Sequence, residues 1–310
     1  MLRISQARTR PRSAVALLAA SVLAHAAAAQ TTYKLYFLGG QSNMDGYGYV
    51  SDLPEDLRAP MPGAVIFHGN PAPDDSLTGG KGTWAPLRPG HGVGFSSDGA
   101  GNTYSERFGV ELTFAQQLRE LDPQANIAIV KYSRGGTSID ADAAGRFGCW
   151  DPDYGGREGV NQYDHFLATV RNAVAVSDVD GDGMPDELVP AGIVWMQGES
   201  DAAYTAEIAF RYRENLERLM NLIRAAFHMD DLPIVIGRIS DSGQDDDGKV
   251  WGYGDVVRGA QAAFVEQDAA AALVTSTDEY AYSDPWHYDS RGYVDLGRRF
   301  AEAMAGLEGR

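Results

Sequence analysis

The 310-residue chain contains a single cysteine, Cys149, so no disulfide can form within it. Its core must therefore be stabilised by the burial of apolar side chains, which a chain of this length can achieve. Basic residues are also scarce, with 26 Lys and Arg against 43 Asp and Glu. Nucleic acid and anionic membranes both attract positive surfaces, so this charge balance argues against both as partners.

Long apolar runs are missing after the first 29 residues. Four arginines within residues 3–12 precede an apolar segment at 14–24, and three alanines at 27–29 form a small-residue cleavage site. This pattern predicts a secretory signal peptide over residues 1–29, with an apolar core too short for a stable membrane-spanning helix. We therefore expect one domain over residues 30–310 that is secreted or periplasmic and does not bind a membrane.

Short apolar runs alternate with longer amphipathic segments along the chain. The apolar runs predict strands at 34–38, 64–67, 126–132, 191–196, 233–239 and 272–276. Apolar residues at helical spacing predict helices at 106–121, 162–176, 206–227, 255–267 and 290–305. Strands followed by helices indicate a doubly wound parallel α/β sheet. The glycine-rich segments 70–102 and 139–160 are longer than ordinary connections, so we expect functional loops there.

Four polar clusters follow four of the predicted strands. They are Ser42 after the first strand, and the segments 133–138, 197–201 and 284–287 after three others. Ligands of open α/β sheets bind at the carboxyl ends of the strands, so these clusters are expected to share one cleft. Together they supply a serine hydroxyl, hydrogen-bond donors, a histidine base and carboxylates, which are the groups of a serine hydrolase.

The motifs themselves resemble a known superfamily. Gly-Gln-Ser-Asn-Met at 40–44, Gly-Gly-Thr-Ser at 135–138, Gln-Gly-Glu-Ser-Asp at 197–201 and Asp-x-x-His at 284–287 occur in that order. The sequence is similar in these motifs to SGNH/GDSL hydrolases, and within them to the sialate O-acetylesterase-like group that includes carbohydrate esterase family 6. The resemblance implies an SGNH hydrolase fold, which is a flavodoxin-like, doubly wound parallel sheet with helices on both faces.

The resemblance also implies the roles of the site residues. Ser42 is the expected nucleophile, His287 the general base and Asp284 the carboxylate that orients it. The expected oxyanion donors are the backbone N–H of Ser42, a glycine N–H from the Gly135-Gly136 pair, for which we favour Gly136, and the side-chain amide of Gln197.

Glu199 has two interpretations. It lies two residues after Gln197 and could replace Asp284 as the carboxylate partner of His287. Alternatively it ties loops together, with Arg134 or another basic residue, and we favour this structural role.

A separate acidic segment covers residues 178–188. Its Asp-x-Asp-x-Asp-Gly start matches the beginning of a calcium loop, whereas its twelfth position is Val189 instead of the usual glutamate. The hypothesis is a structural Ca²⁺ ion, and the alternative is a solvated acidic turn. The candidate ligands are Asp178, Asp180, Asp182, Met184 and Asp186.

These observations predict a secreted serine esterase that removes acetyl groups from carbohydrate through an acetyl-serine intermediate, with no cofactor for catalysis. Acetyl xylan or a related plant polysaccharide is the preferred substrate, and O-acetylated sialic acid is the alternative within the class. A non-catalytic carbohydrate-binding protein on a hydrolase fold is the alternative outside it, since fold alone does not imply activity.

Overall fold

The structure is a computed structural model that describes residues 30–73, 76, 78–156 and 159–309. The predicted signal peptide, residues 1–29, lies outside the described residues, and the division of the chain at residue 29 stays a prediction. No helix in the described ranges is long and apolar enough to cross a membrane.

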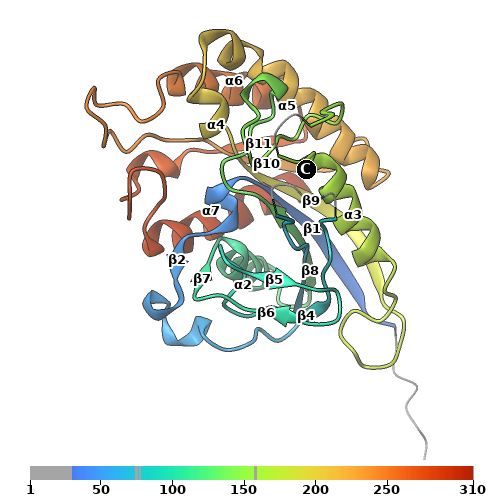
Figure 1. The fold of residues 1–310 in the computed structure, drawn as a ribbon. Coiled ribbons are helices and arrows are strands. Elements are labelled where there is room, and N and C mark those ends of the chain that lie inside the picture. Colours follow the sequence, from blue (N-terminus) through green and yellow to red (C-terminus); the bar gives the residue numbers. More distant parts are fainter. Residues whose placement is uncertain (1–29, 74–75, 77, 157–158, 310) are drawn as a thin grey trace, which may run out of the picture.

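A seven-stranded sheet forms the centre of the molecule, with the strand order β11-β10-β9-β1-β8-β3-β4 (Figure 1). Six neighbouring strands run parallel, and β4 pairs with β3 in the antiparallel direction at one edge. The strands are β1 (Thr32–Gly40), β3 (Ala64–His68), β4 (Trp84–Pro86), β8 (Asn126–Ser133), β9 (Glu187–Met196), β10 (Ile234–Gly237) and β11 (Ala271–Val274).

The predicted α/β class is confirmed, and all six predicted strands belong to this sheet. One detail departs from the flavodoxin strand order, in which the second parallel strand lies beside the first. Here β8 lies between β1 and β3, so that β1 has β8 and β9 as its neighbours. The antiparallel strand β4 was not predicted, because it arises inside the glycine-rich segment 70–102.

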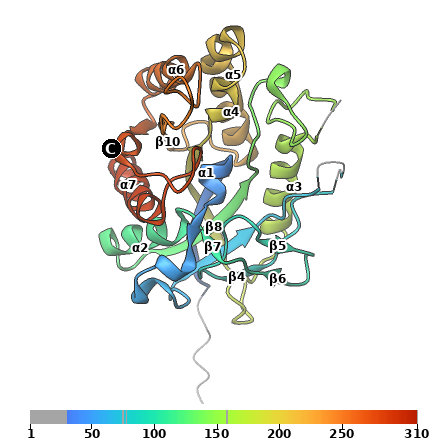
Figure 2. The ribbon, with the colours of Figure 1, turned by 60° about the vertical axis from the view of Figure 1, so that its left-hand side comes forward.

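Five long helices within the described part of the chain flank the sheet. Helices α2 and α7 pack against each other on one face, α3 and α5 lie on the other, and α6 packs against α5 and β11 (Figures 1 and 2). These helices are α2 (Glu111–Leu121), α3 (Gln162–Val174), α5 (Ala206–Ala226), α6 (Gly254–Gln267) and α7 (Ser290–Glu308).

Shorter elements complete the chain between these helices and the sheet. Two small antiparallel ribbons pair β2 with β7 and β5 with β6. The strands of these ribbons are β2 (Gly48–Tyr49), β7 (Arg107–Phe108), β5 (Ser96–Ser97) and β6 (Asn102–Thr103). The short helices are α1 (Ser42–Asp45), α4 (Glu199–Ala202), η1 (Val50–Asp52), η2 (Glu55–Leu57), η3 (Ala141–Ala143) and η4 (Ser276–Glu279).

Three of the long helices begin at a side chain that caps them. Asn161 accepts hydrogen bonds from the backbone of Tyr163 and Asp164 at α3, and Thr205 and Asp289 cap α5 and α7 in the same way. A capping oxygen satisfies backbone N–H groups that have no partner within the helix. The starts of α3, α5 and α7 therefore agree with the predicted helices to within one residue.

The helix predicted at 106–121 begins five residues later than expected, at Glu111. Arg107 and Phe108 instead form strand β7 against Gly48 and Tyr49. Phe108 is buried and fits the helical spacing of the apolar residues that follow it, so the predicted helix included a segment that is in fact extended. The backbone N–H of Gly109 donates to the Glu111 carboxylate, which closes the turn between strand and helix.

A buried ion pair supports the carboxyl end of β8. The Lys131 ammonium donates to Glu111 Oε2 at 2.8 Å, and neither side chain is exposed to solvent. The same ammonium donates to the backbone carbonyls of Asp45 and His91. Because all three ammonium hydrogens have partners, the charge is compensated and the segments carrying Asp45 and His91 are fixed to the sheet.

Breaking this pair should destabilise the protein strongly. Glu111→Gln leaves the Lys131 charge buried without its counter-ion, and we expect the free energy of unfolding in urea to fall by about 3–5 kcal/mol. Glu302→Gln, which breaks the solvent-exposed pair with Arg299, is the matched control and should change it by less than about 1 kcal/mol. Equal effects of the two substitutions would contradict this account of Lys131.

Candidate active site

A close approach between the neighbouring parallel strands β1 and β9 positions Ser42, the predicted nucleophile. Gly40 ends β1 with a φ of +145°, and a Cβ atom there would lie 1.9 Å from the Met196 carbonyl oxygen. Only glycine fits this approach. The next residue, Gln41, donates its backbone N–H to the same carbonyl at 2.9 Å. The chain then turns into the short helix α1, whose first residue, Ser42, lies at the floor of a pocket.

His287 and Asp284 form a hydrogen-bonded pair on the loop before α7. The two side chains meet at 2.7 Å between His287 Nδ1 and Asp284 Oδ2. The other carboxylate oxygen accepts the backbone N–H groups of Trp286 and His287, both at 2.8 Å. Partial burial acts to raise the pKa of Asp284, but the hydrogen bonds from His287 and Trp286 outweigh it and hold the pKa below its usual value.

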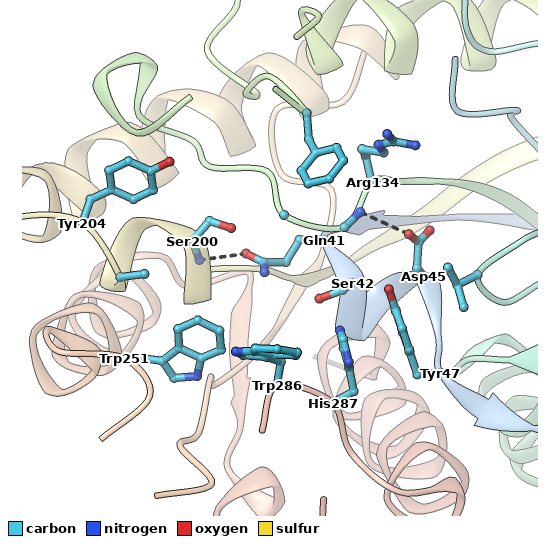
Figure 3. A pocket seen from close by; sticks show the side chains of 15 residues that line it. Gln41, Ser42, Asp45, Tyr47, Arg134, Ser200, Tyr204, Trp251, Trp286 and His287 are labelled. Carbon is cyan, nitrogen blue, oxygen red and sulfur yellow. Dashed lines mark hydrogen bonds between the residues drawn. The ribbon is translucent and has the colours of Figure 1, made fainter. Parts of the chain in front are cut away.

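This pair determines the tautomer of the imidazole. A charged carboxylate only accepts hydrogen bonds, so Nδ1 carries a proton and Nε2 of the neutral ring is left as a base. His287 and Ser42 line the same pocket, and Figure 3 shows the His287 ring next to the Ser42 side chain. The structure therefore brings together the three residues predicted as nucleophile, base and orienting carboxylate.

Tyr47 holds the histidine ring from one side, a contact not anticipated from the sequence. The Tyr47 and His287 rings are stacked, with centroids 3.5 Å apart and planes 5° from parallel. The backbone carbonyl of Tyr47 accepts a hydrogen bond from the Arg107 guanidinium, which anchors this segment to β7. The stack fixes the plane of the imidazole and hence the direction of Nε2.

The glycine pair predicted for the oxyanion hole lies beside Ser42. Gly135 donates its backbone N–H to Asp45 Oδ2 at 3.1 Å, and a Cβ atom on Gly135 would lie 3.3 Å from Ser42 Cβ. That N–H is therefore engaged. Gly136 lines the pocket with a φ of +71°, and a Cβ atom there would lie 2.6 Å from the Phe147 ring. Of the pair, this arrangement favours Gly136 as the donor.

The Gln197 amide, which is predicted as the third donor, is engaged by protein partners outside the pocket. Its Nε2 donates to the Thr137 carbonyl at 3.1 Å and to Asp201 Oδ2 at 2.6 Å, which occupies both amide hydrogens. Its Oε1 accepts from the Tyr212 hydroxyl at 3.0 Å. The side chain has no exposed surface and does not line the pocket. Gln197 therefore links the end of β9 to Thr137, to Asp201 on α4 and to Tyr212 on α5.

Glu199 is hydrogen-bonded to a neutral residue, Asn43, where the favoured structural role predicted Arg134 or another basic residue. Glu199 Oε1 accepts a hydrogen bond from Asn43 Nδ2 at 2.8 Å. The same amide nitrogen donates to the Trp286 carbonyl at 3.2 Å, and Asn43 Oδ1 accepts from the Tyr293 hydroxyl. Burial raises the pKa of Glu199 to about 6, although the bond from Asn43 acts in the opposite direction. Glu199 thus ties α4 to α1, and Asn43 in turn ties α1 to the loop that carries His287.

Aromatic side chains form much of the remaining pocket wall. The cavity has a volume of about 480 Å³, and Trp251 and Trp286 stand on one side of it (Figure 3). Half of the Trp286 side chain, 51%, is exposed. The two glycine-rich segments predicted at the rim reach the pocket through Val93 and Phe147. Trp286 is the contact that sequence inspection could have found, because it stands inside the Asp-x-x-His motif.

The acidic segment lies on the connection between α3 and β9. Carboxylate oxygens of Asp178, Asp180 and Asp186 come within 4.8 Å of one another. Asp182 is not part of this group, and its carboxylate accepts the backbone N–H of Met184. The structure therefore assembles three of the predicted carboxylate ligands and leaves Asp182 outside.

Comparisons with known proteins agree with the resemblance seen in the motifs. A family model described as "Carbohydrate esterase, sialic acid-specific acetylesterase" matches residues 32–306, which confirms the inferred family. No curated protein matches the chain.

Solved structures share the fold. The chain is 21% identical to a protein from Arabidopsis thaliana with a TM-score of 0.62, over 88% of this chain and 98% of that one. It is 21% identical to a carbohydrate acetylesterase from Xanthomonas citri with a TM-score of 0.60, over 89% and 57% of the two chains. It is 16% identical to NanS with a TM-score of 0.57, over 90% and 98%. At these identities the likeness shows the fold alone.

The two carboxylates near the base should differ in their effect on activity. Asp284→Asn allows the amide to donate to Nδ1 and favours the wrong tautomer, so we expect kcat for 4-nitrophenyl acetate to fall by about 10,000-fold. Glu199→Gln keeps an acceptor for Asn43 and should reduce kcat far less. An equal or larger loss in Glu199→Gln would transfer the orienting role from Asp284 to Glu199.

Proposed function

We propose, on the premise that this chain belongs to the carbohydrate esterase family of sialic acid-specific acetylesterases, that it removes O-acetyl groups from carbohydrate with Ser42 as nucleophile. Members of this family are carboxylic ester hydrolases, and the carbohydrate acetylesterase class applies to this chain. The observation that carries the serine mechanism is one pocket lined by Ser42, Gly136 and His287, with the His287 ring hydrogen-bonded to Asp284.

The first half of the reaction forms an acetyl-enzyme. The Ser42 hydroxyl attacks the acetyl carbonyl carbon while His287 Nε2 takes its proton, and Asp284 stabilises the resulting imidazolium. The carbonyl oxygen becomes an oxyanion that accepts hydrogen bonds from the backbone N–H groups of Ser42 and Gly136. The C–O bond to the sugar then breaks, and His287 returns the proton to the leaving alcohol.

The second half releases acetate. Water takes the place of the sugar, gives a proton to His287 Nε2 and attacks the acetyl-serine carbonyl. Collapse of this second tetrahedral intermediate breaks the bond to Ser42, and the serine oxygen recovers the proton from His287. No step requires a metal or an organic cofactor.

The aromatic wall supports a carbohydrate substrate. His287 protonates the leaving alcohol, so the sugar must lie on the His287 side of the pocket, where the exposed face of Trp286 is available for stacking. A wall of this kind suits a neutral sugar ring, whose C–H groups pack against an indole. Acetyl xylan or a related plant polysaccharide is therefore the proposed substrate, acted on by a secreted or periplasmic enzyme.

O-acetylated sialic acid is the second candidate, and two observations favour it. The description of the matching family model names sialic acid. Arg134 lines the pocket and is a cation of the type that binds the carboxylate of a sialic acid.

The first test is acetate release from acetylated xylan and from O-acetylated sialic acid. We expect Ser42→Ala to lower the release by about 1,000-fold or more, because its nucleophile is lost. Ser51→Ala, at an exposed serine outside the pocket, is the matched control and should behave as the wild type. Activity in Ser42→Ala equal to that of the wild type would refute the serine mechanism.

The same assay separates the two substrates. If the substrate is a sialic acid, Arg134→Gln should raise KM for it while leaving KM for a neutral acetylated sugar nearly unchanged. Release from xylan that is indifferent to Arg134→Gln, with no release from sialic acid, would support the polysaccharide.

The acidic loop is proposed to bind a structural Ca²⁺ ion. Asp178, Asp180 and Asp186 supply carboxylate oxygens, the ligand type that calcium prefers, and Asp186 Oδ1 is buried without a hydrogen-bond partner among the described residues. Tyr33 donates to Asp180 at 2.9 Å, so an ion there would tie the loop to the start of β1.

Calcium should act on stability and leave the chemistry unchanged. A chelator should lower the melting temperature. Calcium at 100 times its Kd should raise the free energy of unfolding by about 2.7 kcal/mol. Asp180→Asn should weaken this response, whereas magnesium at the same concentration should give little. A melting temperature that changes neither with chelator nor with added calcium would refute the proposed calcium site.

A further inference from the structure

A glutamine that does line the pocket, Gln41, comes just before Ser42, and its side-chain amide is held in place. Gln41 is 97% buried and lines the pocket beside Ser42. Its Oε1 accepts the backbone N–H of Gly198 at 3.2 Å and that of Ser200 at 3.3 Å. The oxygen of the amide is thus fixed by two backbone donors at the start of α4.

The position of this oxygen determines where the amide nitrogen lies. An amide is planar, so with Oε1 directed at Gly198 and Ser200 the Nε2 group faces the other way. In Figure 3 the Gln41 amide lies between Ser200 and Ser42, and its nitrogen is turned toward the centre of the pocket. Among the described residues, no protein acceptor is seen for this nitrogen, whereas both hydrogens of the Gln197 amide are occupied.

We propose that the side-chain amide of Gln41 is the third donor of the oxyanion hole, in the place for which Gln197 was predicted. This inference rests on the proposed serine esterase reaction. The Gln41 side chain reaches from the end of β1 to the loop after β9 and presents an amide there next to Ser42. The backbone N–H groups of Ser42 and Gly136 supply the other two donors.

The arrangement meets the physical requirement for such a donor. Transition-state stabilisation depends on donors that are already oriented before the charge develops. The backbone of Gln41 is fixed at its N–H by Met196 and at its carbonyl by Met44 and Asp45. With the side-chain oxygen fixed as well, little reorganisation is needed when the acetyl carbonyl becomes an oxyanion.

Gln41→Glu is the variant that tests the donor. The carboxylate keeps oxygens that accept from Gly198 and Ser200, and it has the same length, but the N–H₂ group is lost. We expect kcat to fall by about 100- to 1,000-fold with KM little changed, the loss found when one oxyanion donor is removed. Gln124→Glu, at an exposed residue near the amino end of β8, makes the same chemical change far from the site and should leave the rate unaltered.

Two substrates distinguish an oxyanion donor from a sugar-binding group. The loss should be of similar size for 4-nitrophenyl acetate, which has no sugar, and for an acetylated sugar. A boronic acid that forms a tetrahedral adduct on Ser42 should also bind about 100-fold more weakly to the variant. Loss confined to the sugar ester, loss expressed only in KM, or an unaltered rate would each overturn the assignment.

A second variant and a nucleophile control complete the design. Gln41→Met has the same length without a charge, and it decides the question if Gln41→Glu melts below the assay temperature. It should lose activity on both esters, and wild-type rates in this variant would refute the proposal. If wild type and Ser42→Ala hydrolyse 4-nitrophenyl acetate equally, the proposed function itself has failed, which is a different outcome from any change at Gln41.

Discussion

The site depends on the register of three parallel strands. Gly40 at the end of β1 pairs with Ser133 on β8 and with Met196 on β9. The residues that follow these three positions therefore leave the sheet at one level, and they carry the nucleophile, the glycine pair and the loop that holds Gln41. A shift of one residue in either ladder would turn the side chains of a strand to the opposite face of the sheet and disperse this group.

Buried polar groups transmit this register to the nucleophile. The Asp45 carboxylate accepts from the Ser133 hydroxyl at 2.5 Å and from the Gly135 N–H at 3.1 Å, so one side chain joins α1 to the glycine loop. The Lys131 ammonium holds the backbone carbonyl of the same Asp45. Buried charges of this kind contribute little net stability compared with apolar side chains of the same volume. Their contribution here is to fix Ser42 relative to Gly136.

The three residues proposed for catalysis could be selected from the sequence because each is tied to a local pattern. Ser42 follows a predicted strand, and Asp284 and His287 are close enough in sequence for one turn to bring them together. No local pattern of this kind distinguishes Gln41 from Gln197 as a donor to the oxyanion. Gln197 is occupied by Tyr212 from α5 and Asp201 from α4, and these contacts exist only after the helices have packed. Tyr47 was missed for the same reason, since its stacking on His287 joins segments 240 residues apart.

Electrostatics at two ranges bear on the choice of substrate. The chain carries a formal net charge of −17, which at long range disfavours an anionic substrate. At physiological salt the field of a surface charge is screened over about 8 Å, so inside the pocket a nearby group outweighs the distant charges. Arg134 is a cation that lines the pocket, and the buried Asp45 carboxylate lines it as well. An acidic protein can therefore accept a single carboxylate next to Arg134 while it repels a polyanion. A neutral polysaccharide is neither repelled by the net charge nor attracted by Arg134.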